Sequence, residues 1–225
     1  MAELKKIITE QLFSSPLSGF EVPDAAELNR GLISASNERR SAEAGMRVTN
    51  QYGWHSDRDL FSRPEPAYRT LCSHITGALI YTAQTTLNGF SLETHDIQGQ
   101  GWVNINGKGG FNTPHDHGSF HWSGCYYASI PETAEERSGN IEFLDPRGCV
   151  GFNPAEVSLI FAPKFQVAPK AGQMLIFPSY LRHWVYPNQE DADRISIAFN
   201  ARIVRRVLAA SDVVSPISAD PVGRP

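Results

Sequence analysis

The sequence predicts a mainly β protein, an antiparallel sandwich or jelly roll, with a layer of helices at its N-terminal end. Two observations support this prediction. After about residue 97, short β-type runs alternate with Gly, Pro and Asn turns, and no clear helix intervenes. Before residue 95, apolar residues instead recur with helical spacing. The β-type runs are GWVNIN, WSGCYYASI, NIEFLD, VSLIFAP, GQMLIFP and RISIAFNARI.

Two helices are expected in the first 95 residues. The first lies within PDAAELNRGLISASNERRSAEAG, where Pro23–Asp24 is a candidate N-terminal cap and Gly45 a candidate end. The second lies within AYRTLCSHITGALIYTAQTTL, where Leu71, Ile75 and Leu79 form one apolar stripe. The segment between them, NQYGWHSDRDLFSRPEP, is predicted to be a turn-rich loop.

The chain is expected to form a single domain over its 225 residues. Within it we expect a mainly helical N-terminal layer over residues 1–95 and a jelly-roll catalytic core over residues 97–203. The Pro-rich segment 204–225 is interpreted as a C-terminal extension that runs over the surface or onto a partner chain.

Composition excludes several classes of protein. The net charge of −4 provides neither a basic footprint for nucleic acid nor a polybasic patch for anionic lipid. No segment approaches the roughly 20 apolar residues that span a bilayer, and the N-terminus lacks the apolar run of a secretory signal. Cys72, Cys125 and Cys149 are odd in number and far apart, so we expect a reduced, cytoplasmic protein.

Histidines gather in the segment FNTPHDHGSFHWSGCYYASIP, which holds three of the seven in the chain. In an extended strand His115 and His117 project from the same face and can converge on one metal ion, while Asp116 projects from the other. His183, which follows the predicted strand GQMLIFP, is the candidate third ligand. His121 is interpreted as structural or close to the substrate.

The run RISIAFNARI alternates cleanly between two faces. One face carries Arg194 and Ser196, a fixed cation and a hydroxyl, and arginine can bind a carboxylate through two hydrogen bonds. Asn104 in GWVNIN is a further candidate for a pocket. Tyr126 and Tyr127 are neighbours on one predicted strand, so their side chains face opposite ways. This alternation leaves open which of them faces the pocket, and we name Tyr126 as the candidate pocket residue.

Four motifs occur in order: GWHS (53–56), HDHGSFHWSGCYYASIP (115–131), GQMLIFPSYLRHWVYPN (172–188) and RISIAFN (194–200). Together they resemble the iron(II)- and 2-oxoglutarate-dependent oxygenases, and in particular a bacterial and phage branch of that superfamily. The resemblance covers most of residues 50–203. It implies a double-stranded β-helix, Fe(II) as the metal, and 2-oxoglutarate and O2 as cosubstrates.

The resemblance also implies roles for single residues. His115 corresponds to the first iron ligand, His183 to the distal ligand, and Arg194 to the residue that binds the far carboxylate of 2-oxoglutarate. The chain departs from the superfamily at His117, where aspartate or glutamate is usual. The site would then hold three imidazoles and one less negative charge. Asp116 could replace His117 as the middle ligand only if a bulge turned it inward.

The activity implied is that of a hydroxylase-type dioxygenase, in which 2-oxoglutarate is decarboxylated to succinate and a prime substrate is oxidised. Two alternatives stay open. One is a cupin-like, three-histidine metalloenzyme that does not use 2-oxoglutarate; the other is a non-catalytic metal-binding domain. A zinc hydrolase is disfavoured because the sequence has no HExxH motif. The prime substrate is not determined, and a homodimer is one candidate for the oligomeric state.

Overall fold

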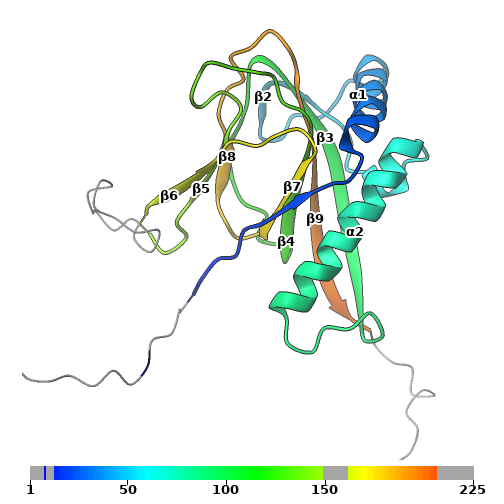
Figure 1. Ribbon diagram of the computed structural model, residues 1–225, viewed down its shortest axis with the longest axis vertical. Coiled ribbons are helices and arrows are strands. Elements are labelled where there is room, and N and C mark those ends of the chain that lie inside the picture. The colour runs from blue at the N-terminus through cyan, green and yellow to red at the C-terminus, as the bar shows by residue number, and fades with distance from the viewer. Residues whose placement is uncertain (1–7, 9–12, 149–161, 207–225) are drawn as a thin grey trace, which may run out of the picture.

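The computed structural model describes residues 8, 13–148 and 162–206 (Figure 1). Strands dominate these residues, and helices are confined to the N-terminal part. The strands are β1 (Ser18–Glu21), β2 (Asn50–His55), β3 (His95–His115), β4 (Trp122–Ser129), β5 (Ile141–Leu144), β6 (Lys164–Val167), β7 (Gln173–Pro178), β8 (His183–Val185) and β9 (Arg194–Arg205). The helices are α1 (Ala25–Ala42), the short 3-10 helix η1 (Leu60–Ser62) and α2 (Pro66–Thr86).

The strands form one curled antiparallel sheet in the order β1-β7-β4-β9-β3-β8-β5-β6, with β2 paired to β3. The long strand β3 produces the curl. Its first part pairs with β9 from His95 to Asn106, and its end pairs with β8 at Asn112 and His115. The pairing with β8 includes a register shift, which bends the strand. The predicted jelly roll is therefore confirmed.

Helices α1 and α2 lie side by side against the outer face of the sheet, next to β3 and β9 (Figure 1). The predicted stripe of Leu71, Ile75 and Leu79 is buried there with the apolar face of β9. Asp24 precedes α1 as predicted, although its side chain makes no capping hydrogen bond. No helix within the described ranges is long and apolar enough to cross a membrane.

The two faces of β9 separate the core from the pocket. Ile195, Ile197, Phe199 and Ala201 pack with the helices, as the alternation predicted. Close packing at Phe199 depends on Gly124 of β4, because a Cβ atom at Gly124 would overlap the phenyl ring. The glycine of the SGCYY motif is thus explained by the packing of two neighbouring strands.

Three parts of the secondary-structure prediction are corrected. The predicted loop NQYGWHSDRDLFSRPEP contains β2 and η1, and the alternation of β2 is broken where Tyr52 adopts a positive φ of 52° at a register shift. GWVNIN forms the middle of a longer strand, β3. His183 begins β8, a three-residue strand too short to show a period.

Some predictions concern residues that the structure does not describe. Most of VSLIFAP (157–163), Cys149 and residues 207–225 of the predicted C-terminal extension fall outside the described ranges.

Candidate metal centre and adjoining pocket

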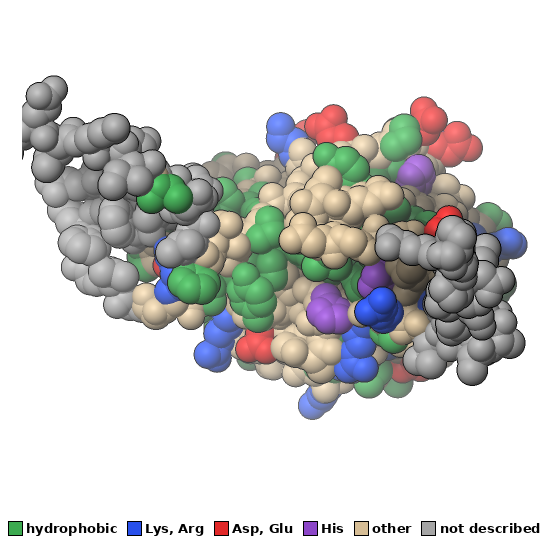
Figure 2. Space-filling model, turned by 90° about the horizontal axis from the view of Figure 1, so that it is seen from below, with side chains coloured by type: hydrophobic (Ala, Val, Ile, Leu, Met, Phe, Trp, Pro, Cys, Tyr) green, Lys and Arg blue, Asp and Glu red, His purple; other side chains and the backbone are tan. Residues whose placement is uncertain are grey.

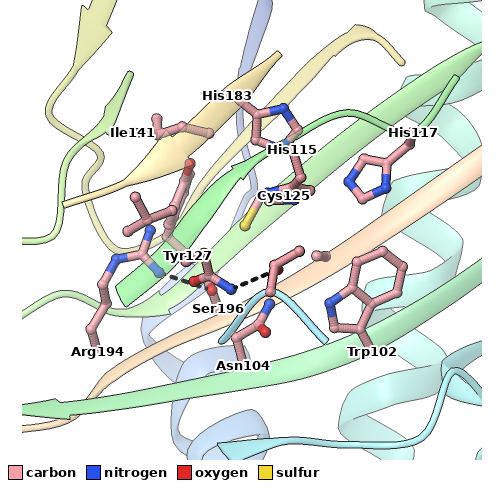
Figure 3. Close-up of a pocket in the computed structure, with 14 residues that line it drawn as sticks. Trp102, Asn104, His115, His117, Cys125, Tyr127, Ile141, His183, Arg194 and Ser196 are labelled. Carbon is pink, nitrogen blue, oxygen red and sulfur yellow. Dashed lines mark hydrogen bonds between the residues drawn. The ribbon is translucent and has the colours of Figure 1, made fainter. Parts of the chain in front are cut away.

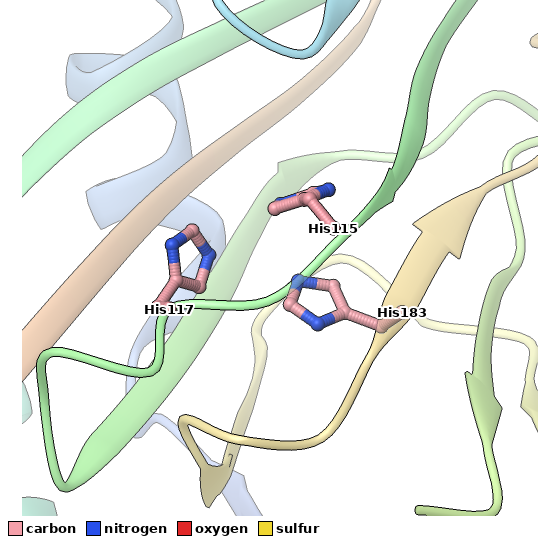
Figure 4. A group of neighbouring side chains, drawn as sticks. All are labelled: His115, His117 and His183. Carbon is pink, nitrogen blue, oxygen red and sulfur yellow. The ribbon is translucent and has the colours of Figure 1, made fainter.

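Three histidines meet at one end of the curled sheet (Figure 4). His115 ends β3, His117 lies two residues beyond it, and His183 begins β8. One ring nitrogen from each lies within 4.8 Å of the others. His115 and His183 are direct partners in the β3–β8 ladder, and their ring centroids are 4.4 Å apart. Strand pairing therefore brings together two residues that are far apart in the sequence.

Backbone carbonyls orient two of the rings. The Nδ1 atom of His115 donates to the carbonyl oxygen of Thr113 at 2.6 Å, and Nδ1 of His183 donates to that of Leu181 at 2.8 Å. A carbonyl only accepts, so each ring carries its proton on Nδ1 and leaves Nε2 available for a metal ion. His117 is held through its backbone, because its N–H donates to the carbonyl oxygen of Ser179 at 2.8 Å.

All three imidazoles are electrically neutral at pH 7. Burial, followed by the neighbouring His115, lowers the pKa of His183 to about 3 and that of His117 to about 4. Burial also lowers the pKa of His115. A neutral imidazole is the form that binds a metal ion, so no proton has to be displaced at neutral pH.

These lowered pKa values predict that the metal-free protein loses stability in mild acid. In the unfolded chain these histidines take up protons near pH 6.5, whereas folded His117 and His183 do so only near pH 4 and 3. Stability is therefore complete above pH 6.5 and falls as the pH drops towards 4, by about 1–2 kcal/mol per histidine at pH 5. Urea unfolding of the metal-free protein at pH 7.5 and 5.0 measures this loss.

The matched control is the double variant His117→Gln/His183→Gln. It should show a smaller loss of stability between the two pH values than the wild type, because two of the groups that resist protonation are gone. An identical loss in both proteins would show that these histidines do not determine the pH dependence.

Arg194 lies at the other end of the pocket from His117 (Figure 3). Its side chain is only 2% exposed, and its guanidinium lies 5.3 Å from the centre of the Tyr127 ring. Nε donates to the carbonyl oxygen of Gly139 at 2.9 Å, and Nη1 donates to Oγ of Ser196 at 3.0 Å. No carboxylate in the described part of the chain pairs with it. A buried cation with only neutral partners is suited to an anionic ligand.

The pocket between the histidines and Arg194 holds about 430 Å³ of space, part of it open to solvent. Ser196 and Asn104 line it, as expected from their sequence positions. Oδ1 of Asn104 and the hydroxyl of Tyr127 are buried without a nitrogen or oxygen partner among the described residues. Such orphaned polar atoms fit a polar ligand. Trp102, Thr49, Asn112, Cys125, Ile141, Val185 and Ala198 complete the lining.

The choice of Tyr126 as a pocket residue is wrong. Its hydroxyl donates to Oδ1 of Asn29 on α1 at 2.6 Å, and its ring is buried among the helices. Tyr127 lines the pocket instead. Alternation along β4 correctly placed the two tyrosines on opposite faces, but it carries no information about which face the helices cover.

Two other candidates lie outside the cluster. Asp116 is exposed, and its Oδ1 accepts the N–H of Gly118, so it does not replace His117 in the group. Nδ1 of His121 accepts a hydrogen bond from the N–H of Ile203, which agrees with the prediction that this residue has a structural role. Sequence reasoning did not select Trp102 as a pocket residue, although its position two residues before Asn104 on β3 places both on the same face.

Comparison with known proteins agrees with this geometry. A family model described as "Putative 2OG-Fe(II) oxygenase" matches residues 100–200. No curated protein sequence matches the chain. Among solved structures, a prolyl-4-hydroxylase from Pseudomonas putida is similar with a TM-score of 0.60 and 15% identity, over 85% of this chain and 94% of that one.

Two further solved structures share the fold. The viral collagen prolyl hydroxylase of Paramecium Bursaria Chlorella virus-1 has a TM-score of 0.53 and 13% identity, over 85% of this chain and 96% of that one. The non-heme alpha-ketoglutarate-dependent epimerase SnoN of nogalamycin biosynthesis has a TM-score of 0.58 and 15% identity, over 91% and 86%. The family match spans the segment that carries the three histidines and Arg194, and the three solved structures share the fold of this chain.

Proposed function

We propose that this protein is a hydroxylase-type dioxygenase in which His115, His117 and His183 hold Fe(II) and Arg194 binds 2-oxoglutarate. The observation that carries the proposal is the shared pocket: three neutral imidazoles lie at one end, and a buried arginine without a carboxylate partner among the described residues lies at the other. Imidazole nitrogens suit Fe(II), and three ligands leave further positions on the metal open.

The residues around Arg194 suit a diacid. The far carboxylate of 2-oxoglutarate would accept hydrogen bonds from the guanidinium and from the hydroxyl of Ser196, which already contact one another. The hydroxyl of Tyr127, which has no nitrogen or oxygen partner among the described residues, is a further donor inside the pocket. These groups would orient the cosubstrate so that its keto acid end faces the histidines. The walls of the pocket would limit the access of water.

Iron held by these histidines would supply the oxidation: 2-oxoglutarate would lose CO2 and take up one oxygen atom of O2 to become succinate, and the other oxygen atom would enter the prime substrate. The chain's own contribution is to bind, orient and shield the reactants. The cupin-like enzyme that ignores 2-oxoglutarate and the non-catalytic metal-binding domain remain alternatives to this proposal. Neither gives a reason for burying, in the same pocket, an arginine that has no counter-ion in the described part of the chain.

The proposed function is tested by anaerobic titration of the Fe(II) protein with 2-oxoglutarate. We expect the visible metal-to-ligand charge-transfer band of the chelated keto acid, and succinate formation once oxygen is admitted. Glutarate is the matched control, because it has both carboxylates but lacks the keto group, so it should give no band. Oxygen uptake without the band and without succinate would favour the cupin-like enzyme. Bound iron with no oxygen uptake would favour the binding domain.

We also propose a cytoplasmic location. Cys72 and Cys125 are free thiols in the structure, and such thiols are typical of a reducing compartment.

A further inference from the structure

The charges of the pocket do not balance in the proposed complex. Among the described residues, its lining includes Arg194 and the three histidines, and it includes no aspartate or glutamate. Fe(II) would add two positive charges, and 2-oxoglutarate would add two negative charges. Arg194 then leaves one positive charge in a partly desolvated site. A site of this kind favours a negatively charged second ligand.

A second arginine lies over one of the residues that line this pocket. The guanidinium carbon of Arg58 is 5.8 Å from the centre of the Trp102 ring, and Trp102 lines the pocket. The same indole ring meets His117 edge-on, with ring centroids 5.8 Å apart. Figure 3 shows Trp102 and His117 at the end of the pocket away from Arg194. The arginine over Trp102 therefore lies near the histidine end of the pocket, where a prime substrate would approach the iron.

The guanidinium of Arg58 is available to a ligand. Its side chain is exposed and forms no ion pair or hydrogen bond within the described part of the chain. Asp57 and Asp59 flank Arg58 in the sequence, and Asp59 pairs instead with Arg39 and Arg63. Neither of them pairs with Arg58, and Asp116, which follows the ligand candidate His115, accepts the N–H of Gly118. On one face of the molecule, basic side chains lie beside histidine side chains (Figure 2).

The Trp102 ring over which Arg58 lies is held by contacts with the GWHS motif. The buried imidazole of His55 stacks on Trp102 at 5.4 Å with an interplanar angle of 13°. Nδ1 of His55 donates to the carbonyl oxygen of Ser56, which fixes the imidazole in turn. Ser56 forms two hydrogen bonds with Val103, the neighbour of Trp102. Its N–H donates to the carbonyl oxygen of Val103, and its Oγ accepts the N–H of Val103. The GWHS motif thus holds the ring over which the guanidinium lies. A planar guanidinium held over an aromatic ring keeps its N–H edge free for an anion.

We propose that Arg58 is a specificity-determining residue that binds an anionic group of the prime substrate, a carboxylate or a phosphate, at the mouth of the pocket beside His117. The inference rests on the proposed function, since it assumes that Arg194 is occupied by 2-oxoglutarate. It assigns the two arginines to two different anions: the buried one to the cosubstrate, and the exposed one to the substrate that is oxidised.

The test uses three probes that share a phenyl ring: benzoate, phenyl phosphate and the uncharged benzamide, which matches benzoate in shape. Their affinities for the Fe(II) protein saturated with 2-oxoglutarate are measured anaerobically by calorimetry. We expect at least one anion to bind about 10-fold more tightly than benzamide, and Arg58→Gln to remove about that factor. The anion that binds more tightly identifies the anionic group of the prime substrate as a carboxylate or a phosphate. Arg58→Glu should reverse the preference in favour of benzylamine, a cation of similar shape.

Arg69→Gln is the matched control, because Arg69 is an exposed arginine on α2 without an ion pair in the described residues. It should bind both anions as the wild type does. Equal binding of anions and benzamide, no measurable binding of either anion, or unchanged anion affinity in Arg58→Gln would overturn the inference. A wild-type protein that does not bind 2-oxoglutarate in the preceding step would instead refute the proposed function.

Discussion

His183→Ala is expected to abolish stoichiometric Fe(II) binding while the protein stays folded. The imidazole of His183 is one of three nitrogen donors that lie within 4.8 Å of one another. Residues that merely orient a ligand affect metal affinity by about 10- to 100-fold, so loss of a ligand should exceed about 100-fold. Equilibrium dialysis with metal analysis, together with circular dichroism, measures affinity and folding in the same samples.

His183 also contacts Phe143 and Phe177, so its removal could disturb the apolar cluster inside the barrel. His115→Ala is therefore needed as a second variant, since His115 is the last residue of β3 and is less buried than His183. His121→Ala is the matched control from the same segment, because this exposed histidine lies outside the cluster, and it should bind a full equivalent of iron. Full iron occupancy in both ligand variants would refute the assignment.

Arg194→Met should nearly remove 2-oxoglutarate binding and leave iron binding little changed. A bidentate, charge-assisted pair in a partly desolvated pocket contributes roughly 2–4 kcal/mol, which corresponds to about 30- to 1000-fold in affinity. Arg194→Lys should lie between the wild type and Arg194→Met, because lysine keeps the charge but loses the planar fork. The charge-transfer band in an anaerobic titration reports the affinity directly.

Arg205→Met provides the control for Arg194→Met. Arg205 belongs to the same strand, β9, but it is exposed and lies outside the pocket. Its replacement should leave the titration unchanged. If Arg194→Met bound 2-oxoglutarate as tightly as the wild type, the buried arginine would not be the anchor, and the cupin-like alternative would gain support.

Local patterns in the sequence were sufficient for the fold class and for most of the candidate site. Strand alternation predicted that Arg194 and Ser196 share a face opposite Ile195 and Ile197, and the structure confirms it. The alternation works here because β9 is a regular strand buried on both sides, so each face must match its surroundings. The spacing of His115 and His117 likewise predicted two side chains that converge.

Other features depended on contacts between distant segments. The curl of β3 and its pairing with β8 place His183 beside His115, and no local pattern encodes that register. The register shift at Tyr52 hid β2 within an apparent loop, because the side-chain period changes there by one residue.

The sequence by itself determined a mainly β jelly roll, a histidine cluster and a strand that carries a cation, since each of these follows from residue type and local period. The tertiary structure alone decided that Tyr127 and not Tyr126 lines the pocket, and that Arg58 lies over Trp102. The physical reason is the same in both cases. Which face of a strand becomes the interior depends on where the helices pack, and contacts between side chains that are distant in the sequence exist only once the sheet has curled.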